Sequence, residues 1–376
     1  MKKIKILHFE LDHNLGGIEM FLLNLYKEID RNLIQFDFIT QSDTPALEND
    51  LKDLGANIFK VSNSNNVLKY RNDILKIISL KEYDLIHIHK NSLANIIPLL
   101  CAKKRNLPII LHSHNTRPST GKISYLLHII NKNKAYKLAN EHFACSNEAG
   151  KWMYGNLHYD IIRNGILTDN FRFNSQKRKK IRLSMELPED AFIVGNVGRF
   201  TKQKNHEKLI DIFNDILKTN ENSYLLLIGT GENKDFIKKK VIKLGIINNV
   251  KFLGNRNDIP DLLMTMDAFV MPSLYEGLPI SAVEAQATGL KTYLSDKISK
   301  ETELSSVVNW FSIEWDACSI AKLILEDTKI SNNRTLSNDE IIKAGFSMEL
   351  SAKFIQETYI KYVTRESNDF RKGFGL

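Results

Sequence analysis

Short apolar runs alternate with longer amphipathic stretches along the first half of the chain. The short runs lie between turn residues and predict strands, whereas apolar positions that recur every three or four residues predict helices. The predicted strands cover residues 4–9, 36–40, 56–61, 85–89, 109–111 and 142–145. The predicted helices cover residues 18–28, 47–54, 67–81, 95–104 and 125–138.

The same alternation restarts near residue 192 and continues through the second half. Here the predicted strands cover residues 192–197, 224–229, 250–253, 268–271 and 291–294. The predicted helices cover residues 205–218, 234–244, 259–266 and 280–288, and a long amphipathic helix follows over 348–364. Strands that alternate with helices indicate parallel sheets covered on both faces. The pattern therefore predicts an α/β protein with two doubly wound, Rossmann-like domains, separated within the charged and irregular stretch 164–188.

Composition narrows the class of protein. The chain has 376 residues, 43% of them hydrophobic, which suits two globular domains. No apolar run reaches the roughly 18 residues of a membrane-spanning helix, and the first residues predict a strand because Glu10 and Asp12 interrupt any signal-like segment. Cys101, Cys145 and Cys318 lie far apart without a CxxC pair. We therefore expect a reducing, cytoplasmic location and no metal site.

The net charge of +8 offers three classes of partner: nucleic acid, an anionic membrane or a phosphorylated small molecule. Basic runs include residues 103–105 and the KRKKIR sequence at 177–182. No sequence signature of a nucleic-acid-binding module accompanies them, so we expect no nucleic acid partner. A lysine-rich surface without any partner would give the same net charge, and that alternative stays open.

Two glutamates flank a Gly-Leu-Pro turn at the start of the predicted helix 280–288. Glu276 and Glu284 belong to the sequence YEGLPISAVEAQATG. Carboxylates accept hydrogen bonds from pairs of sugar hydroxyls, and the free N–H groups of a helix start bind phosphate oxygens. The segment therefore suits a ligand with hydroxyls and phosphates. The alternative is a capped surface helix that carries two solvated acids.

A basic loop and a glycine turn provide further candidates. Arg199 and Lys204 lie in GRFTKQKN, directly after the first strand of the second domain, where their charges could neutralise a diphosphate. Gly16 and Gly17 follow the first strand of the chain and permit a close backbone approach to a phosphate or sugar. The turn lacks the GxGxxG pattern of dinucleotide binding, and a tight strand-to-helix turn explains it equally well.

Four histidines lie at the ends of two predicted strands. His87 and His89 belong to DLIHIHK, and His112 and His114 to LHSHN. Residues two apart on a strand point to the same side, so each pair shares one direction. Without carboxylate or cysteine ligands nearby, hydrogen bonds to sugar hydroxyls are a better interpretation than a metal site. A structural role for these histidines is the alternative.

The ordered motifs GGIE, HSHN, RNGI, GRFTKQKN, GTGE, FLGNR and EGLPISAVE resemble the retaining glycosyltransferases of family 4, and in particular their capsule and exopolysaccharide branch. The resemblance covers nearly the whole chain. It implies the GT-B fold, in which two Rossmann-like domains face an interdomain cleft and a C-terminal helix crosses back to the first domain. The implied domains are 1–168 plus about 350–376 on the acceptor side, and 169–349 for the nucleotide-sugar.

The resemblance assigns roles in donor binding. Arg199 and Lys204 would bind the donor diphosphate, and Glu284 would bind the ribose hydroxyls. Glu276, with the two N–H groups that follow it, would bind the sugar hydroxyls and the distal phosphate. The other donor-side residues that the resemblance implies are Gly17, Gly254, Arg256, Gly277 and Leu278.

On the acceptor side, His114 matches the family's cleft histidine near the reacting sugar. Together with Glu276, Arg199 and Lys204 it makes up the implied catalytic set. The implied acceptor-side residues are His89, His112 and Asn164. The resemblance implies neither a cofactor nor a metal, because the chain has no DxD motif of the donor-binding kind.

The implied reaction is sugar transfer from a nucleotide-sugar, with UDP as the expected carrier, to a glycan or a saccharide linked to polyprenyl diphosphate. The resemblance implies retention of the anomeric configuration and a role in surface polysaccharide synthesis. A peripheral location at the inner membrane surface would bring Lys103, Lys104, Arg105 and Lys122 near anionic lipid. Two alternatives remain: a nucleotide-sugar epimerase of the same fold, and a non-catalytic basic binding protein.

Overall fold

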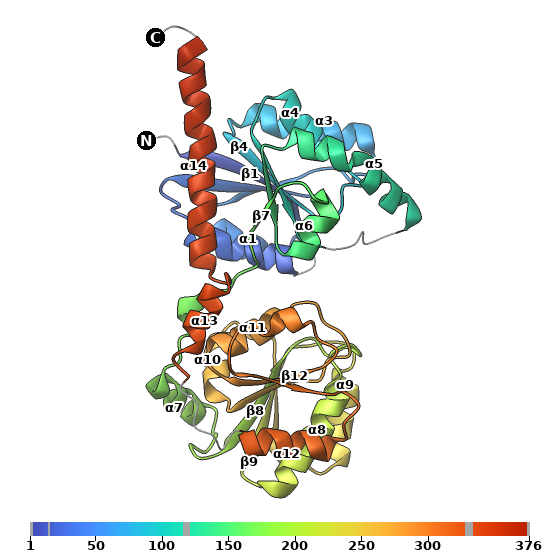
Figure 1. The fold of residues 1–376 in the computed structure, drawn as a ribbon, viewed down its shortest axis with the longest axis vertical. Helices are drawn as coiled ribbons and strands as arrows, with labels where there is room; N and C mark the ends of the chain where they lie inside the picture. Colours follow the sequence, from blue (N-terminus) through green and yellow to red (C-terminus); the bar gives the residue numbers. More distant parts are fainter. Residues whose placement is uncertain (1–2, 14–15, 116–120, 328–333, 374–376) are drawn as a thin grey trace. The chain divides into compact units, whose positions relative to one another are not determined.

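The computed structural model describes residues 3–13, 16–115, 121–327 and 334–373, and it describes side chains up to residue 364. The chain divides into two compact units, one of Met1–Gly165 with Gly345–Leu376 and one of Ile166–Ala344. The predicted divisions, after residue 168 and before residue 350, lie a few residues further along the chain. Each unit is an α/β structure of its own (Figure 1).

The first unit contains a seven-stranded sheet in which every strand pair is parallel. Its strands are β1 (Ile4–Leu11), β2 (Ile34–Thr40), β3 (Asn57–Lys60), β4 (Leu85–Lys90), β5 (Ile109–Ser113), β6 (Glu141–Ala144) and β7 (Asp160–Ile161). The strand order is β3-β2-β1-β4-β5-β6-β7. The order reverses between β1 and β4, which is where doubly wound sheets bind ligands at the carboxyl ends of their strands.

Helices cover both faces of this sheet. They are α1 (Gly17–Glu28), α2 (Glu48–Asp53), α3 (Val67–Leu80), α4 (Ile97–Lys104), α5 (Lys122–Leu138), α6 (Asn147–Tyr154) and α14 (Met348–Gly373). Leu7 and Phe9 of β1 pack in the core beneath α3 to α6. Strand residues alternate between faces, so His8 points to the opposite side, where Phe21 of α1 and Tyr359 of α14 contact the histidine side chains.

The second unit contains a six-stranded parallel sheet of order β10-β9-β8-β11-β12-β13. The strands are β8 (Phe192–Val197), β9 (Ser223–Ile228), β10 (Val250–Gly254), β11 (Ala268–Met271), β12 (Lys291–Ser295) and β13 (Val308–Phe311). The helices are α7 (Ser175–Ser184), α8 (His206–Thr219), α9 (Lys234–Lys243), α10 (Ile259–Thr265), α11 (Ile280–Ala287), α12 (Ala317–Asp327) and α13 (Ser337–Lys343). The prediction of two doubly wound, Rossmann-like domains is confirmed.

The stretch 164–188 is not irregular as predicted, because it contains α7. Part of its basic run is structural. Arg182 is 2% exposed and donates hydrogen bonds to the carbonyl oxygens of Thr265 and Ala191 and to the carboxylate of Asp267. Arg178 pairs with the other oxygen of Asp267. A basic run can therefore form a helix when its arginines satisfy buried carbonyl groups of the neighbouring elements.

Candidate functional site

The basic loop of the second unit begins where β8 ends. The Gly198 N–H donates to the Ile228 carbonyl of β9, which keeps the loop beside the neighbouring strand end. Gly229 has a φ of +134°, and a Cβ there would lie 2.1 Å from the Gly198 oxygen. Only glycine at position 229 therefore permits this approach. The loop ends at Asn205, whose side chain accepts a hydrogen bond from the Lys208 N–H and caps α8.

The loop before α11 is fastened to this basic loop. The Leu274 N–H donates to the Gln203 carbonyl at 2.8 Å, and the Gln203 amide donates to the Tyr275 carbonyl at 2.9 Å. On its other side, the Glu276 carbonyl accepts a hydrogen bond from the Ser299 N–H at 3.0 Å. These contacts bring together two segments that lie about 70 residues apart in the sequence.

As a result, Lys204 and Glu276 form an ion pair, with Lys204 Nζ 2.7 Å from Glu276 Oε1. Both side chains are largely buried, at 17% and 12% exposure, so the pair is weakly screened by solvent. The ammonium has three donors and the carboxylate two acceptor oxygens, so both groups retain capacity for a ligand. Within the described residues, the N–H groups of Gly277 and Leu278 have no hydrogen-bond partner.

Arg199 and Glu284 complete the group of candidate residues in this unit. Arg199 is exposed, and its guanidinium forms no hydrogen bond or ion pair with any residue that the structure describes. Glu284 lies on α11, where burial raises the pKa of its carboxyl to about 8. Its carboxyl likewise has no partner among the described side chains and backbone groups. A protonated glutamic acid with unused oxygens can bind the hydroxyls of a ligand.

Gly254 and Arg256 have other partners. The Gly254 carbonyl accepts the Gly229 N–H at 2.8 Å, which joins the ends of β9 and β10. The Arg256 guanidinium makes two hydrogen bonds to Asp258, at 2.8 and 2.6 Å. Their assignment to donor binding stays a prediction.

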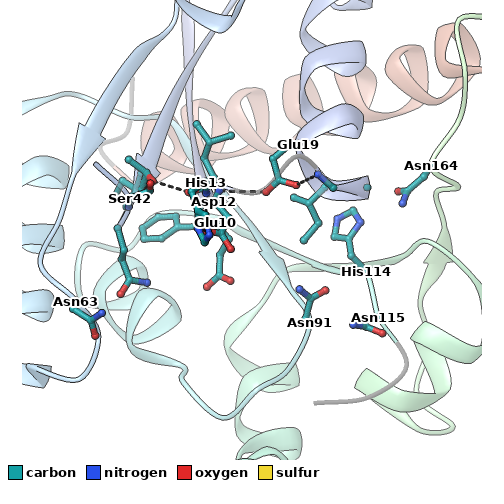
Figure 2. A pocket seen from close by; sticks show the side chains of 18 of the residues that line it. Glu10, Asp12, His13, Glu19, Ser42, Asn63, Asn91, His114, Asn115 and Asn164 are labelled. Carbon is teal, nitrogen blue, oxygen red and sulfur yellow. Dashed lines mark hydrogen bonds and ion pairs between the residues drawn. The ribbon is translucent and has the colours of Figure 1, made fainter. Parts of the chain in front are cut away.

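The first unit contains a pocket of about 600 Å³ at the carboxyl ends of β1 and its neighbours (Figure 2). Gly17, His114 and Asn164, all predicted from the sequence, line it. Glu19 also lines the pocket, and its carboxylate accepts hydrogen bonds from the Gly16 N–H at 3.0 Å and the Asp12 N–H at 3.2 Å. Glu19 thereby caps α1 and joins its first turn to Asp12, the residue after the end of β1.

Four polar residues that sequence reasoning overlooked also line this pocket or support it. Lys90, the last residue of β4, forms an ion pair with Glu10 of β1. Asn91 and Asn115 line the pocket one and two residues after the ends of β4 and β5. The signal was the repeated pattern of HIHKN and HSHN, which places the same residue types at two neighbouring strand ends.

Behind the pocket, five histidines form a row on the sheet face that α1 and α14 cover. The strand register aligns His8 with His87, and His89 with His112, and His114 follows two residues later. His8 Nδ1 lies 3.1 Å from His89 Nε2, and His89 Nδ1 lies 2.9 Å from His114 Nε2. Burial lowers the pKa of all five, to about 3 for His8 and His114, so each imidazole is neutral at neutral pH.

His89 and His112 do not line the pocket, unlike His114. Both side chains are fully buried within the sheet, so neither contacts the space that an acceptor would occupy in the pocket. The difference from the predicted acceptor-side role arises because strand alternation directs them under α1, where Phe21 packs against both rings.

Two groups of these histidines, His8 with His87 and His89, and His89 with His112 and His114, bring ring nitrogens within 4.8 Å of one another. The chemistry of three imidazoles suits a transition-metal ion such as zinc. The prediction of no metal therefore stays a prediction.

Comparison with known proteins identifies the family. Residues 15–170 match the model "Glycosyltransferase Family 4", and residues 177–304 match "Glycosyl transferases group 1". The chain is 30% identical over 311 residues to the putative glycosyltransferase EpsF of Bacillus subtilis (strain 168), covering 80% of this chain and 81% of that protein. The chain belongs to glycosyltransferase family 4. The family assignment made from the ordered motifs is thus confirmed.

Two further proteins match this chain over almost their full length. The chain is 25% identical over 387 residues to the UDP-Gal:alpha-D-GlcNAc-diphosphoundecaprenol alpha-1,3-galactosyltransferase of Escherichia coli, covering 97% of this chain and 98% of that protein. The crystal structure of Anabaena Alr3699/HepE in complex with UDP has a TM-score of 0.69 at 20% identity and covers 98% of this chain and 100% of that one. This structural likeness supports the GT-B fold.

Proposed function

We propose that this glycosyltransferase moves a sugar from UDP to a saccharide carried on polyprenyl diphosphate, with retention of the anomeric configuration, during surface polysaccharide synthesis. One observation carries the proposal. Lys204, Glu276 and the unused N–H groups of Gly277 and Leu278 form one cluster in the second unit. It combines donors for phosphate oxygens with a carboxylate for sugar hydroxyls.

The proposed chemistry is stabilisation of a leaving diphosphate. As the bond to the sugar breaks, negative charge grows on the phosphate oxygens, and Lys204 and Arg199 are the cations that would meet it. Donors already in place before the reaction provide the largest share of many rate enhancements. Because these cations would carry that charge, we propose turnover without a metal, which a comparison of rates with and without EDTA tests.

Glu276 and Glu284 would recognise different parts of the donor. Glu276 lies beside Lys204 and would accept hydrogen bonds from sugar hydroxyls next to the distal phosphate. Glu284, in the second turn of α11, would bind the ribose hydroxyls. Neither carboxylate acts as the acid or base in this scheme, since the departing phosphate would accept the proton of the acceptor on the same face as the leaving group.

The acceptor would use the pocket of the first unit. Its lining offers neutral and acidic polar groups, among them Asn91, Asn115 and Asp12, that suit the hydroxyls of a saccharide. His114 would lie beside the reacting sugar. The Escherichia coli relative acts on a sugar linked to diphosphoundecaprenol, which supports a lipid-linked acceptor for this chain.

A donor and acceptor screen tests the proposal. UDP-, GDP- and ADP-sugars are each incubated with and without a polyprenyl-diphosphate-linked sugar, and nucleotide release and product are measured. We expect acceptor-dependent release of UDP, and NMR coupling constants that show the donor's anomeric configuration in the product.

The two alternatives give different outcomes in the same screen. A changed sugar without any acceptor would identify an epimerase. A basic binding protein would release no nucleotide, and nucleotide-sugars would not raise its unfolding temperature.

We further propose that α5 contacts the lipid surface. No helix within the described residues has the length and apolar character needed to cross a membrane. However, the first half of α5 exposes apolar side chains, including Ile123, Leu126 and Ile130 at 77%, 59% and 64% exposure. These three lie at helical spacing beside Lys122, an arrangement that suits the interface of an anionic bilayer.

We predict that changing Ile123, Leu126 and Ile130 together to serine weakens sedimentation with vesicles containing phosphatidylglycerol by roughly tenfold or more, because each side chain loses apolar burial in the lipid. The matched control changes Leu68 and Leu80, which are 72% and 70% exposed elsewhere in the same unit. Equal binding of the α5 variant and the control would overturn this role for α5.

A further inference from the structure

Three hydrogen-bonded histidines lie in a line from the interior of the first unit to the pocket. His8, His89 and His114 are together called the file. His89 bonds to His8 through Nε2 and to His114 through Nδ1, at 3.1 and 2.9 Å. His8 and His89 are fully buried, and His114 lines the pocket. A neutral imidazole carries one N–H and one lone pair. Once the proton position of one ring is fixed, those of the other two follow.

Only two arrangements of the protons satisfy both hydrogen bonds. In the first, all three rings are protonated on Nε2, which leaves the His8 Nε2–H without an acceptor among the described residues. In the second, all three are protonated on Nδ1, and His8 Nε2 keeps only a lone pair. Phe36 and Phe38 pack against the His8 ring, with centroids at 4.2 and 5.3 Å, and provide no acceptor oxygen.

The inner end of the file therefore favours protonation on Nδ1. An N–H group buried without a partner is rarer in proteins than a buried acceptor with an unused lone pair. The outer end favours the same arrangement. His114 Nδ1 and Asn164 Oδ1 are both buried and have no hydrogen-bond partner among the described residues, and the Asn164 side chain partly offsets the lowering of the His114 pKa by burial. An amide oxygen only accepts, so these two unpaired atoms can satisfy each other only when Nδ1 carries the proton.

Asn164 continues the file to the pocket wall. With its oxygen toward His114, its amide nitrogen faces Gly17, and a Cβ at position 17 would lie 3.3 Å from that nitrogen. Figure 2 shows His114 and Asn164 on the same side of the pocket. The N–H groups of this amide thus lie beside Gly17, the first residue of α1.

We infer that His8 and His89 are positioning residues that hold His114 in its Nδ1-protonated tautomer and thereby orient the Asn164 amide toward Gly17. The file ends against two phenylalanines, so it has no exit for a proton at its inner end. Its consequence is orientation: the pocket wall presents N–H donors, which suit the oxygens of a saccharide or a diphosphate. This inference deepens the proposed function, and its kinetic consequence rests on it.

The arrangement also argues against a metal as the occupant of the row. The facing nitrogens of His8, His89 and His114 already bind one another. In addition, the His87 and His89 rings are stacked with centroids 4.2 Å apart, so their in-plane lone pairs do not converge on one point.

Nitrogen NMR of the full chain with ¹⁵N-labelled histidine tests the inference without any substrate. We expect His114 and His89 to be protonated on Nδ1 at neutral pH. In His8→Phe, which removes the inner donor, we expect a mixture of tautomers at both. His8→Gln, whose amide can donate to His89, should restore the single tautomer. His87→Phe makes the same change in the same row outside the file and should leave the His114 tautomer unchanged.

Turnover gives the second measurement. We expect His8→Phe to lower kcat roughly tenfold through misorientation, with little change in the donor KM, and His8→Gln to recover most of it. A wild-type His114 protonated on Nε2, a tautomer unaffected by His8→Phe, or one equivalent of zinc in the purified protein would each overturn the inference. If no sugar-nucleotide is turned over, the proposed function fails, while the tautomer result still decides this inference.

Discussion

Replacing Lys204 with alanine is expected to lower kcat/KM for the UDP-sugar by about 10²- to 10³-fold. Removal of one fixed donor from a site where negative charge develops costs about 3 to 4 kcal/mol. Lys204 has this position because Glu276 holds its ammonium at 2.7 Å and both side chains are largely buried. Steady-state release of UDP in the presence of the acceptor measures the effect.

The control must separate lost catalysis from lost stability, since Lys204→Ala also leaves the Glu276 carboxylate buried without its ion pair. Lys240 of α9 offers a close match. It pairs with Asp211 at 2.7 Å and is 19% exposed, against 17% for Lys204. We expect Lys240→Ala to lower the unfolding temperature without a comparable loss of turnover. Equal turnover in the two variants would contradict the role of Lys204.

A double-mutant cycle then shows whether the pair acts as one unit. If Glu276 positions Lys204 as well as binding sugar hydroxyls, Glu276→Ala alone should remove most of the activity that Lys204→Ala removes. The double variant should be little worse than either single one, because residues that act together are strongly non-additive. Additive losses would mean that the two side chains contact the donor independently.

The fold could largely be predicted because strand and helix periods are local properties of the sequence. Apolar runs such as β8 and β11 begin and end at the predicted residues. The omissions have physical causes. The strand β13 contains Asn309 and Trp310, which are only half buried at the sheet edge, so it lacks a continuous apolar run. The helix α7 appeared irregular because its buried contacts come from arginines rather than from apolar residues.

The site could be predicted only in part, since the missing contacts depend on strand order. His114, Gly17 and Asn164 line one pocket, and Lys204 contacts Glu276, in agreement with motifs at strand ends. His8 gave no signal, because a single histidine in a strand is unremarkable until β1 lies beside β4. That neighbourhood aligns His8 with His87 and creates the buried row. The hydrophobic periodicity of a single strand or helix therefore does not predict this row of histidines.

Replacing Glu284 with glutamine is expected to stabilise the protein at pH 8 and to weaken its binding of UDP. Burial raises the pKa of this carboxyl to about 8, from an ordinary value near 4.5. Between these two pH values the folded chain keeps a proton that the unfolded chain has lost. The contribution of Glu284 to stability is therefore complete below about pH 4.5 and is lost as the pH rises toward 8. Glutamine does not ionise, so the variant keeps its stability over this pH range.

The thermal unfolding midpoint measures this effect. One kcal/mol shifts the midpoint of a domain of this size by about 2–4 °C, so we expect Glu284→Gln to unfold on the order of 5 °C higher than the wild type at pH 8 and at nearly the same temperature at pH 5. Glu326→Gln, at a 63% exposed glutamate of the same unit, provides the control for loss of a surface carboxylate and should not raise the midpoint at pH 8. A midpoint difference that does not change with pH would contradict a raised pKa.

The same carboxyl couples nucleotide binding to pH. If the ribose hydroxyls donate to Glu284, they stabilise its charged form and lower its pKa, so UDP binding near pH 7 must release a proton. Calorimetry in two buffers of different ionisation enthalpy should detect that release in the wild type and not in Glu284→Gln, whose affinity should be roughly tenfold lower after loss of charge-assisted hydrogen bonds. Stabilisation without any loss of UDP affinity would place Glu284 outside the ribose site. If Glu284→Gln binds UDP more weakly but releases as many protons as the wild type, Glu284 would instead bind the ribose while already ionised.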